Sequence, residues 1–200
     1  MLTIHVGLHK TGTTTLQRDL AGMKRKELCG VLYRGKDHAD NEGLLARLGH
    51  FQVPKRAEHT PTVRALKKGH NVVLSHENFL GHPYDPEVGE MYSQAVINAA
   101  GIRDFFGDKG PFQLVIYLRP QHQWLESLYN EYAKGRPHSS AVSSTEFADR
   151  IMHVPYFQWT HLISDLKEEL GPNRLVLRPY KVGLNVTVDF LTMLNVTTPK

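Results

Sequence analysis

The sequence predicts an α/β fold, in which a central, mostly parallel sheet is flanked by layers of helices. Two observations lead to this prediction. Short apolar segments alternate with longer amphipathic ones along the chain, as strands and helices do in a parallel sheet. The short segments are apolar throughout, as expected of strands that are buried on both faces. With 200 residues and roughly 150 residues in an average domain, residues 1–200 are expected to form a single domain.

The composition excludes several classes of protein. Hydrophobic residues make up 40% and charged residues 22% of the chain, which is ordinary for a globular protein. Cys29 is the only cysteine, so an internal disulfide is excluded. The longest apolar runs are too short for a membrane span, and no signal peptide is recognisable. The net charge of +4 suits a small anionic ligand or nucleic acid and does not decide between them.

The first third of the chain opens with the pattern of a strand, a loop and a helix. Leu2–Val6 is apolar and β-branched and predicts a strand. Gly7–Thr14 is rich in glycine and threonine and predicts a loop, and Thr15–Met23 has helical spacing. Residues 24–60 are polar and basic, and we expect short helices there, such as Glu42–Leu48.

The middle of the chain continues the alternation. Asn71–Ser75 and Phe112–Leu118 predict two more strands, with a helix over Pro86–Phe106 between them. Pro120 suits the first turn of a further helix. An apolar stripe behind that proline marks the buried face of this helix, formed by Trp124, Leu125, Leu128, Tyr129 and Tyr132.

The last third predicts a polar loop, a helix, a strand and a final helix. The loop covers residues 135–144, the amphipathic helix Pro155–Leu170, the strand Arg174–Leu177 and the last helix Val188–Leu194. In parallel sheets, ligands bind where the carboxyl ends of the strands open into loops. We therefore expect the functional residues directly after the four predicted strands.

The loop after the first strand has the composition of a phosphate-binding loop. Gly7 to Thr14 reads Gly-Leu-His-Lys-Thr-Gly-Thr-Thr, which is close to the P-loop pattern of glycine, four residues, glycine, lysine and serine or threonine. Glycines let backbone N–H groups turn inward, and the start of a helix adds a positive end. Thr13 stands where the P-loop lysine is expected, and the lysine comes earlier, at Lys10. The alternative is a turn whose threonines only cap the helix.

The stretch Lys10-Thr11-Gly12-Thr13-Thr14 resembles the 5′-phosphosulfate loop of sulfotransferases that use 3′-phosphoadenosine-5′-phosphosulfate (PAPS). The resemblance implies a single-domain, three-layer, P-loop-like fold. It also implies that Lys10 contacts the 5′-phosphate and the bridging oxygen of the donor, while the glycine, the threonines and the loop amides bind the same phosphate. His9 either helps to neutralise that phosphate or is a spacer that faces solvent.

A second segment, after the third predicted strand, suits another phosphate. Arg119 follows Leu118 directly, and Ser127 comes eight residues later, in the next helix. A guanidinium can grip a phosphate with two hydrogen bonds and a hydroxyl can donate a third, provided that the helix folds back beside the strand end. The segment resembles the 3′-phosphate-binding segment of the same sulfotransferases. The alternative is an ordinary helix, with Arg119 in a surface ion pair.

Candidate bases follow the second predicted strand. Transfer of a sulfuryl group to a hydroxyl requires a base to take the proton. His76 and Glu77 come directly after Asn71–Ser75, and the resembling family uses either a histidine or a glutamate. We prefer Glu77, with His76 second, although either residue could instead cap a helix. No histidine or cysteine pattern predicts a metal site.

Together these segments predict a cytoplasmic PAPS-dependent sulfotransferase without a metal, a membrane span or a nucleic-acid partner. The acceptor is expected to be a small molecule or glycan, and the glycan-sulfating branch of the family favours a carbohydrate hydroxyl. Relatives usually continue beyond the last helix, so the chain is expected to be a compact member or to lack a C-terminal extension. Two alternatives stay open, namely a magnesium-dependent P-loop kinase or nucleotidase and a non-catalytic nucleotide-binding module on the same fold.

Overall fold

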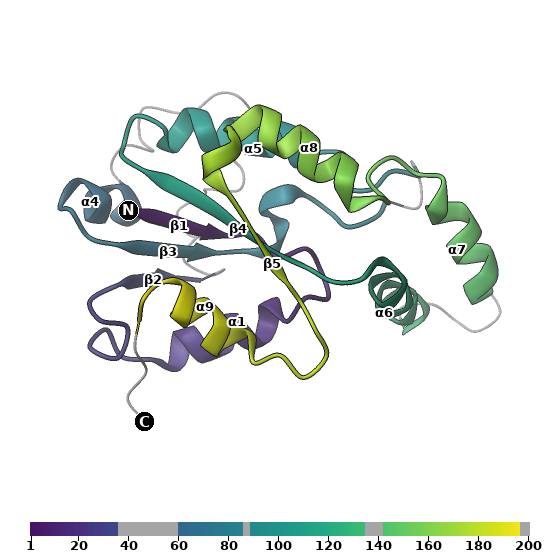
Figure 1. Cartoon of the computed structure of the whole chain (residues 1–200), viewed down its shortest axis with the longest axis horizontal. Coiled ribbons are helices and arrows are strands. Elements are labelled where there is room, and N and C mark those ends of the chain that lie inside the picture. Colours follow the sequence, from purple (N-terminus) through teal and green to yellow (C-terminus); the bar gives the residue numbers. More distant parts are fainter. Residues whose placement is uncertain (36–59, 86–88, 135–141, 197–200) are drawn as a thin grey trace.

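A five-stranded parallel sheet forms the centre of the computed structural model, which describes residues 1–35, 60–85, 89–134 and 142–196. The strands have the order β2-β3-β1-β4-β5, and every adjacent pair is parallel. They are β1 (Leu2–His5), β2 (Leu32–Arg34), β3 (Val72–Ser75), β4 (Phe112–Leu118) and β5 (Leu175–Pro179). The predicted α/β fold with a central parallel sheet is confirmed (Figure 1).

Helices cover both faces of this sheet (Figure 1). Helices α1 (Thr13–Gly22) and α9 (Val186–Met193) lie together on one face. The other face carries α4 (Pro61–Lys67), α5 (Ala95–Phe106) and α8 (Trp159–Leu170). The result is the three-layer arrangement that the alternating sequence pattern predicts.

Two further helices lie past the carboxyl end of the sheet. They are α6 (Gln121–Lys134) and α7 (Ser144–Met152), and they stand apart from the two layers in Figure 1. Short 3₁₀ helices follow β3 and precede β5, at Glu77–Leu80 (η2) and Pro172–Arg174 (η3). Helix α6 begins directly after β4, so it projects from the edge of the sheet where a site is expected.

The two faces of the sheet bury separate hydrophobic clusters because side chains alternate along each strand. In β1, Leu2 and Ile4 join the cluster under α4, α5 and α8. In β4, Val115 and Tyr117 join the smaller cluster under α1 and α9. A central strand with both faces buried gives the continuous apolar run seen in the sequence.

Strand β1 is central and pairs with both β3 and β4. His5, its last residue, is level with Ser75 of β3 and Val115 of β4. The loop that follows β1 therefore emerges between the carboxyl ends of β3 and β4. This topology brings the three predicted site segments to one edge of the sheet.

Several elements differ from the sequence prediction. The predicted helix Pro86–Phe106 begins only at Ala95, and the predicted helix Pro155–Leu170 begins only at Trp159. Tyr92 (φ 46°) and Tyr156 (φ 66°) adopt left-handed backbone conformations, which a helix cannot contain. Strand β2 and helices α4 and α7 were not predicted.

Other boundaries move by one or two residues. The first helix begins at Thr13, the last strand at Leu175 and the last helix at Val186. The predicted helix Glu42–Leu48 and most of the predicted polar loop, residues 135–141, lie outside the described residues. Within the described part of the chain, no helix combines the length and the apolar character needed to cross a membrane.

Candidate functional site

The loop between β1 and α1 wraps tightly on itself. A Cβ atom on Gly7 would lie 1.9 Å from Oγ1 of Thr13, so only glycine fits there. Gly12 caps the helix in a left-handed conformation (φ 79°), and a Cβ on it would lie 3.0 Å from Val186. Lys10 is also left-handed (φ 70°), which is uncommon for a residue with a side chain. These positions turn the backbone sharply into the start of α1.

The start of α1 suits an anion. Gly12 provides no side-chain cap, so no side chain at that position satisfies the first N–H groups of the helix. The Oγ1 atom of Thr13 is buried and makes no hydrogen bond with the described residues. An unsatisfied hydroxyl beside uncapped amides, at the positive end of a helix, is the arrangement that binds a phosphate.

Arg119 joins the second predicted segment to the loop. Its Nη1 atom donates a hydrogen bond to the carbonyl oxygen of Lys10 at 3.2 Å. Its guanidinium lies over the ring of Tyr180, 5.6 Å from the ring centroid. The Nε–H of Arg119 is buried and has no hydrogen-bond partner within the described chain. The hydrogen bond from Nη1 therefore orients the guanidinium, while the Nε–H group is available to donate to a ligand.

The side chain of Lys10 points to helix α6. Its Nζ atom lies 2.9 Å from Oε2 of Glu131, and this ion pair joins residues 121 positions apart. The exposed fractions of the two side chains are 29% for Lys10 and 58% for Glu131. Sequence reasoning missed Glu131, because nothing in its neighbourhood distinguishes it from other surface glutamates.

Helix α6 does fold back along the loop, as the second segment requires. Trp124 donates from Nε1 to the carbonyl oxygen of His9 at 2.9 Å, and Glu131 reaches Lys10. Ser127 is half-buried and lies three residues after Trp124 and four before Glu131, on the same helix face. The spacing therefore places Ser127 on the face of α6 that contacts the loop.

Three buried aromatic residues support the loop and the strand end. The hydroxyl of Tyr92 accepts a hydrogen bond from the backbone N–H of His9 at 3.1 Å. Trp159 donates from Nε1 to the carbonyl oxygen of Arg119 at 2.9 Å, and its ring packs edge-on against Trp124 with centroids 5.0 Å apart. The tryptophans are core residues, as predicted, and they also hold the backbone of the site. Tyr92 was missed because it falls inside the overextended helix prediction.

His76 and Glu77 follow β3 at the same edge. His76 is buried, and its Nδ1 atom accepts a hydrogen bond from the N–H of Asn78 at 3.0 Å, which caps η2. Glu77 is half-buried in the first turn of η2. Its negative charge acts to raise the pKa of both His5 and His9, so its carboxylate is electrostatically close to the loop.

His9 packs against the buried Tyr92. Burial lowers the pKa of His9, and the nearby charge of Glu77 opposes this shift only in part. Its ring lies tilted against that of Tyr92, with centroids 6.2 Å apart. The lowered pKa of His9 favours the uncharged imidazole, and the contact with Tyr92 packs the ring against the core.

A cavity of about 290 Å³ adjoins the loop between α1 and the segment that leads into α9. Gly12, Thr15 and Tyr180 line it. Tyr180 also underlies Arg119, so the cavity lies beside both phosphate-binding candidates. In the described ranges, no group of three or more histidine, cysteine, aspartate or glutamate side chains could hold a metal ion.

The comparison with solved structures agrees with this fold. The chain is similar to a sulfotransferase from Alicyclobacillus acidocaldarius, with a TM-score of 0.54 and 17% sequence identity, over 99% of this chain and 82% of that one. No family model and no curated protein matches the chain by sequence. The chain therefore has the sulfotransferase fold, as the two sequence segments indicated.

Proposed function

We propose that this protein is a PAPS-dependent sulfotransferase that transfers a sulfuryl group to an acceptor hydroxyl. The observation that carries the proposal is the hydrogen bond from Arg119 to the carbonyl of Lys10, which joins the two phosphate segments at one edge of the sheet. Each segment also presents a buried polar atom without a partner in the described chain, Oγ1 of Thr13 and Nε of Arg119. Two such sites side by side suit a ligand with two phosphate groups.

In this proposal, different residues hold different parts of the donor. The amides of residues 11–14, with Thr13, bind the 5′-phosphate, and Arg119 with Ser127 binds the 3′-phosphate. The cavity beside Gly12 and Tyr180 receives the nucleoside, since it adjoins both phosphate sites. PAPS supplies an activated sulfuryl group, and the protein supplies orientation and positive charge.

The acceptor oxygen forms a bond to sulfur while the bond from sulfur to the bridging phosphate oxygen breaks. Glu77 takes the proton of the acceptor hydroxyl, and Lys10 stabilises the negative charge that grows on the leaving 5′-phosphate. The hydrogen bond that occupies Nδ1 of His76 supports Glu77 over His76 as the base. A carbohydrate as acceptor and a cytoplasmic location stay predictions.

Calorimetry with 3′,5′-adenosine bisphosphate, the nucleotide product, tests the donor site. We expect binding with or without magnesium, and at least a tenfold loss of affinity in Lys10→Ala and Arg119→Lys, as for lost charge-assisted hydrogen bonds, each worth about 1.5–3 kcal/mol. Lys26→Ala, an exposed change outside the loop, is the matched control. Absence of binding by the wild-type chain would overturn the proposal.

Transfer of labelled sulfate from PAPS to a panel of sugars, phenols and lipids tests the reaction itself. We expect transfer to a hydroxyl acceptor, abolished by Glu77→Gln with nucleotide binding retained. Phosphate transfer that requires magnesium would instead identify a kinase or nucleotidase. Binding without any transfer would favour the non-catalytic module.

A further inference from the structure

Lys10, the cation of the phosphate loop, forms an ion pair with a carboxylate of helix α6. Its Nζ atom lies 2.9 Å from Oε2 of Glu131 on α6. Lys10 lowers the pKa of the Glu131 carboxyl, first through the hydrogen bond and then through its charge. An incoming phosphate and the Glu131 carboxylate therefore require the same ammonium group.

The backbone of Lys10 is fixed, whereas its side chain can turn. Arg119 binds the carbonyl of Lys10, and Trp124 binds the carbonyl of the preceding residue, His9. These contacts hold the Cα of Lys10 at the loop. Moving Nζ from Glu131 to a ligand therefore needs only rotation about side-chain bonds.

A second cation lies close enough to pair with Glu131 in place of Lys10. Nζ of Lys134, one turn further along α6, lies 4.0 Å from the same Oε2 atom. Lys134 is 77% exposed, so it can move closer without disturbing the core. When Lys10 leaves, Glu131 is not left without a counter-charge.

We propose that Glu131 is a positioning residue that holds Lys10 away from the phosphate site until the nucleotide displaces it. The inference rests on the proposed function and adds a regulation of the same site. Because the ion pair is exposed to solvent, it is weak, and we expect it to change the affinity for nucleotide by no more than about fivefold. A contact of this strength lowers the affinity for nucleotide without preventing binding.

Removal of the Glu131 charge tests the competition. We expect Glu131→Gln to bind 3′,5′-adenosine bisphosphate about two to five times more tightly than the wild-type chain, as the loss of a weak competing ion pair predicts. Glu126→Gln is the matched control, since Glu126 is an exposed glutamate on the same helix whose spacing from Glu131 puts it on another face. Weaker or unchanged binding by Glu131→Gln, or an equal gain in Glu126→Gln, would overturn the inference.

A second measurement separates this inference from the proposed function. The rate at which acetic anhydride modifies Lys10 in the ligand-free chain, followed by mass spectrometry, reports whether Glu131 holds the amine. We expect a faster rate in Glu131→Gln and no change in Glu126→Gln. An unchanged rate refutes the hold on Lys10 even if the nucleotide binds. A faster rate in a chain that binds no nucleotide refutes the proposed function and the competition, but leaves the contact itself established.

Discussion

Gly7 and Thr13 close the two ends of the phosphate loop against each other. A methyl group at position 7 would lie 1.9 Å from Oγ1 and 2.9 Å from Cβ of Thr13, so rotation of the threonine side chain cannot relieve the clash. We expect Gly7→Ala to lower the free energy of unfolding by about 1–3 kcal/mol, the usual range for overpacking, and to abolish nucleotide binding. Urea unfolding and calorimetry measure the two effects.

Gly22 provides the control for that substitution. It lies at the end of α1, its backbone is helical, and a Cβ atom there would meet nothing within 4 Å. Gly22→Ala should therefore leave stability unchanged or raise it by up to about 1 kcal/mol. If Gly7→Ala behaves like Gly22→Ala, the loop is not closed as described.

We expect His5 to make the stability of the protein depend on pH. It is fully buried beneath the loop, where its Nδ1 atom lies 2.8 Å from Oγ of Ser75. Burial lowers the pKa of His5 from 6.5 to about 4. Between these values the unfolded chain binds a proton that the folded chain does not, so stability rises with pH across this window. The full effect is about 3 kcal/mol, since one pKa unit corresponds to about 1.4 kcal/mol.

Unfolding by urea at pH 4.5, 5.5 and 6.5 measures this dependence. We expect His5→Asn to reduce the slope of the unfolding free energy against pH, whatever its effect on stability at pH 7. His161→Asn, a change at an exposed histidine, should leave the profile as it is. A profile that keeps its slope in His5→Asn would show that His5 is not the responsible group.

The residues of the loop could be proposed from the sequence because they are contiguous. Lys10 and Gly12 form a local pattern whose backbone requirements are visible without the fold. Tyr92 could not be found in this way. Its contact with His9 joins residues 83 positions apart and depends on a left-handed turn inside an apparently helical stretch. Glu131 escaped for the same reason, since only tertiary packing brings it to Lys10.

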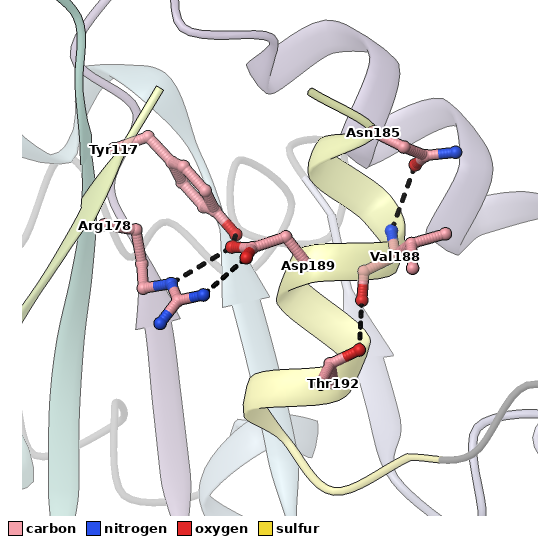
Figure 2. A network of polar contacts seen from close by, with 6 residues as sticks. All are labelled: Tyr117, Arg178, Asn185, Val188, Asp189 and Thr192. Carbon is pink, nitrogen blue, oxygen red and sulfur yellow. Dashed lines mark hydrogen bonds and ion pairs between the residues drawn. The ribbon is translucent and has the colours of Figure 1, made fainter. Parts of the chain in front are cut away.

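Among the elements, α9 is held to the sheet by a polar network (Figure 2). Asp189 of α9 accepts hydrogen bonds from the hydroxyl of Tyr117 in β4 at 2.7 Å and from Nε of Arg178 in β5 at 3.0 Å. Arg178 lowers the pKa of the Asp189 carboxyl, so this stabilisation is present above the ordinary pKa and is lost as pH falls through the lowered one. The network fixes α9, whose Val186 packs beside Gly12.

Substitution of Asp189 should therefore affect both stability and the site. We expect Asp189→Asn to lower the free energy of unfolding by about 1–3 kcal/mol, as for a partly buried, charged hydrogen-bond partner, and to weaken nucleotide binding. Thr192→Ala is the control, because Thr192 is exposed on the same helix and bonds only within it (Figure 2). Equal losses in the two variants would contradict the role of the network.

Four of the five strands were predictable because each contains a run of apolar residues. Strands β1, β3 and β4 are central, and the edge strand β5 contains the run Leu175 to Leu177. Strand β2 was missed because it is an edge strand of three half-buried residues, Leu32 to Arg34, which is too short to show alternation. Helix α7 was missed because it begins with polar residues that continue the composition of the preceding polar loop. Two helices were predicted to begin too early, before Ala95 and before Trp159. The apolar residues ahead of these positions have helical spacing in the sequence, but tertiary contacts bend that part of the chain into turns.

For the molecule as a whole, nucleotide binding should raise thermal stability. A ligand at one hundred times its dissociation constant stabilises the folded state by about 2.7 kcal/mol. For a chain of 200 residues this corresponds to an increase in Tm of about 5–10 °C. Thermal scans with 3′,5′-adenosine bisphosphate should show this shift in the presence of EDTA, and Arg119→Lys should reduce it. A shift that requires magnesium would contradict the proposed site.

The central place of β1 has a consequence for how the protein is made. The phosphate loop is synthesised before the elements that pack against it, and β1 gains its second neighbour only when β4 has been synthesised. The loop is completed later still, when Val186 reaches Gly12 and Thr187 donates to Asp19 across 168 positions of sequence. Contacts of such long range form slowly. Nascent chains that stop before α9 should therefore carry the whole loop sequence and still be unable to retain nucleotide.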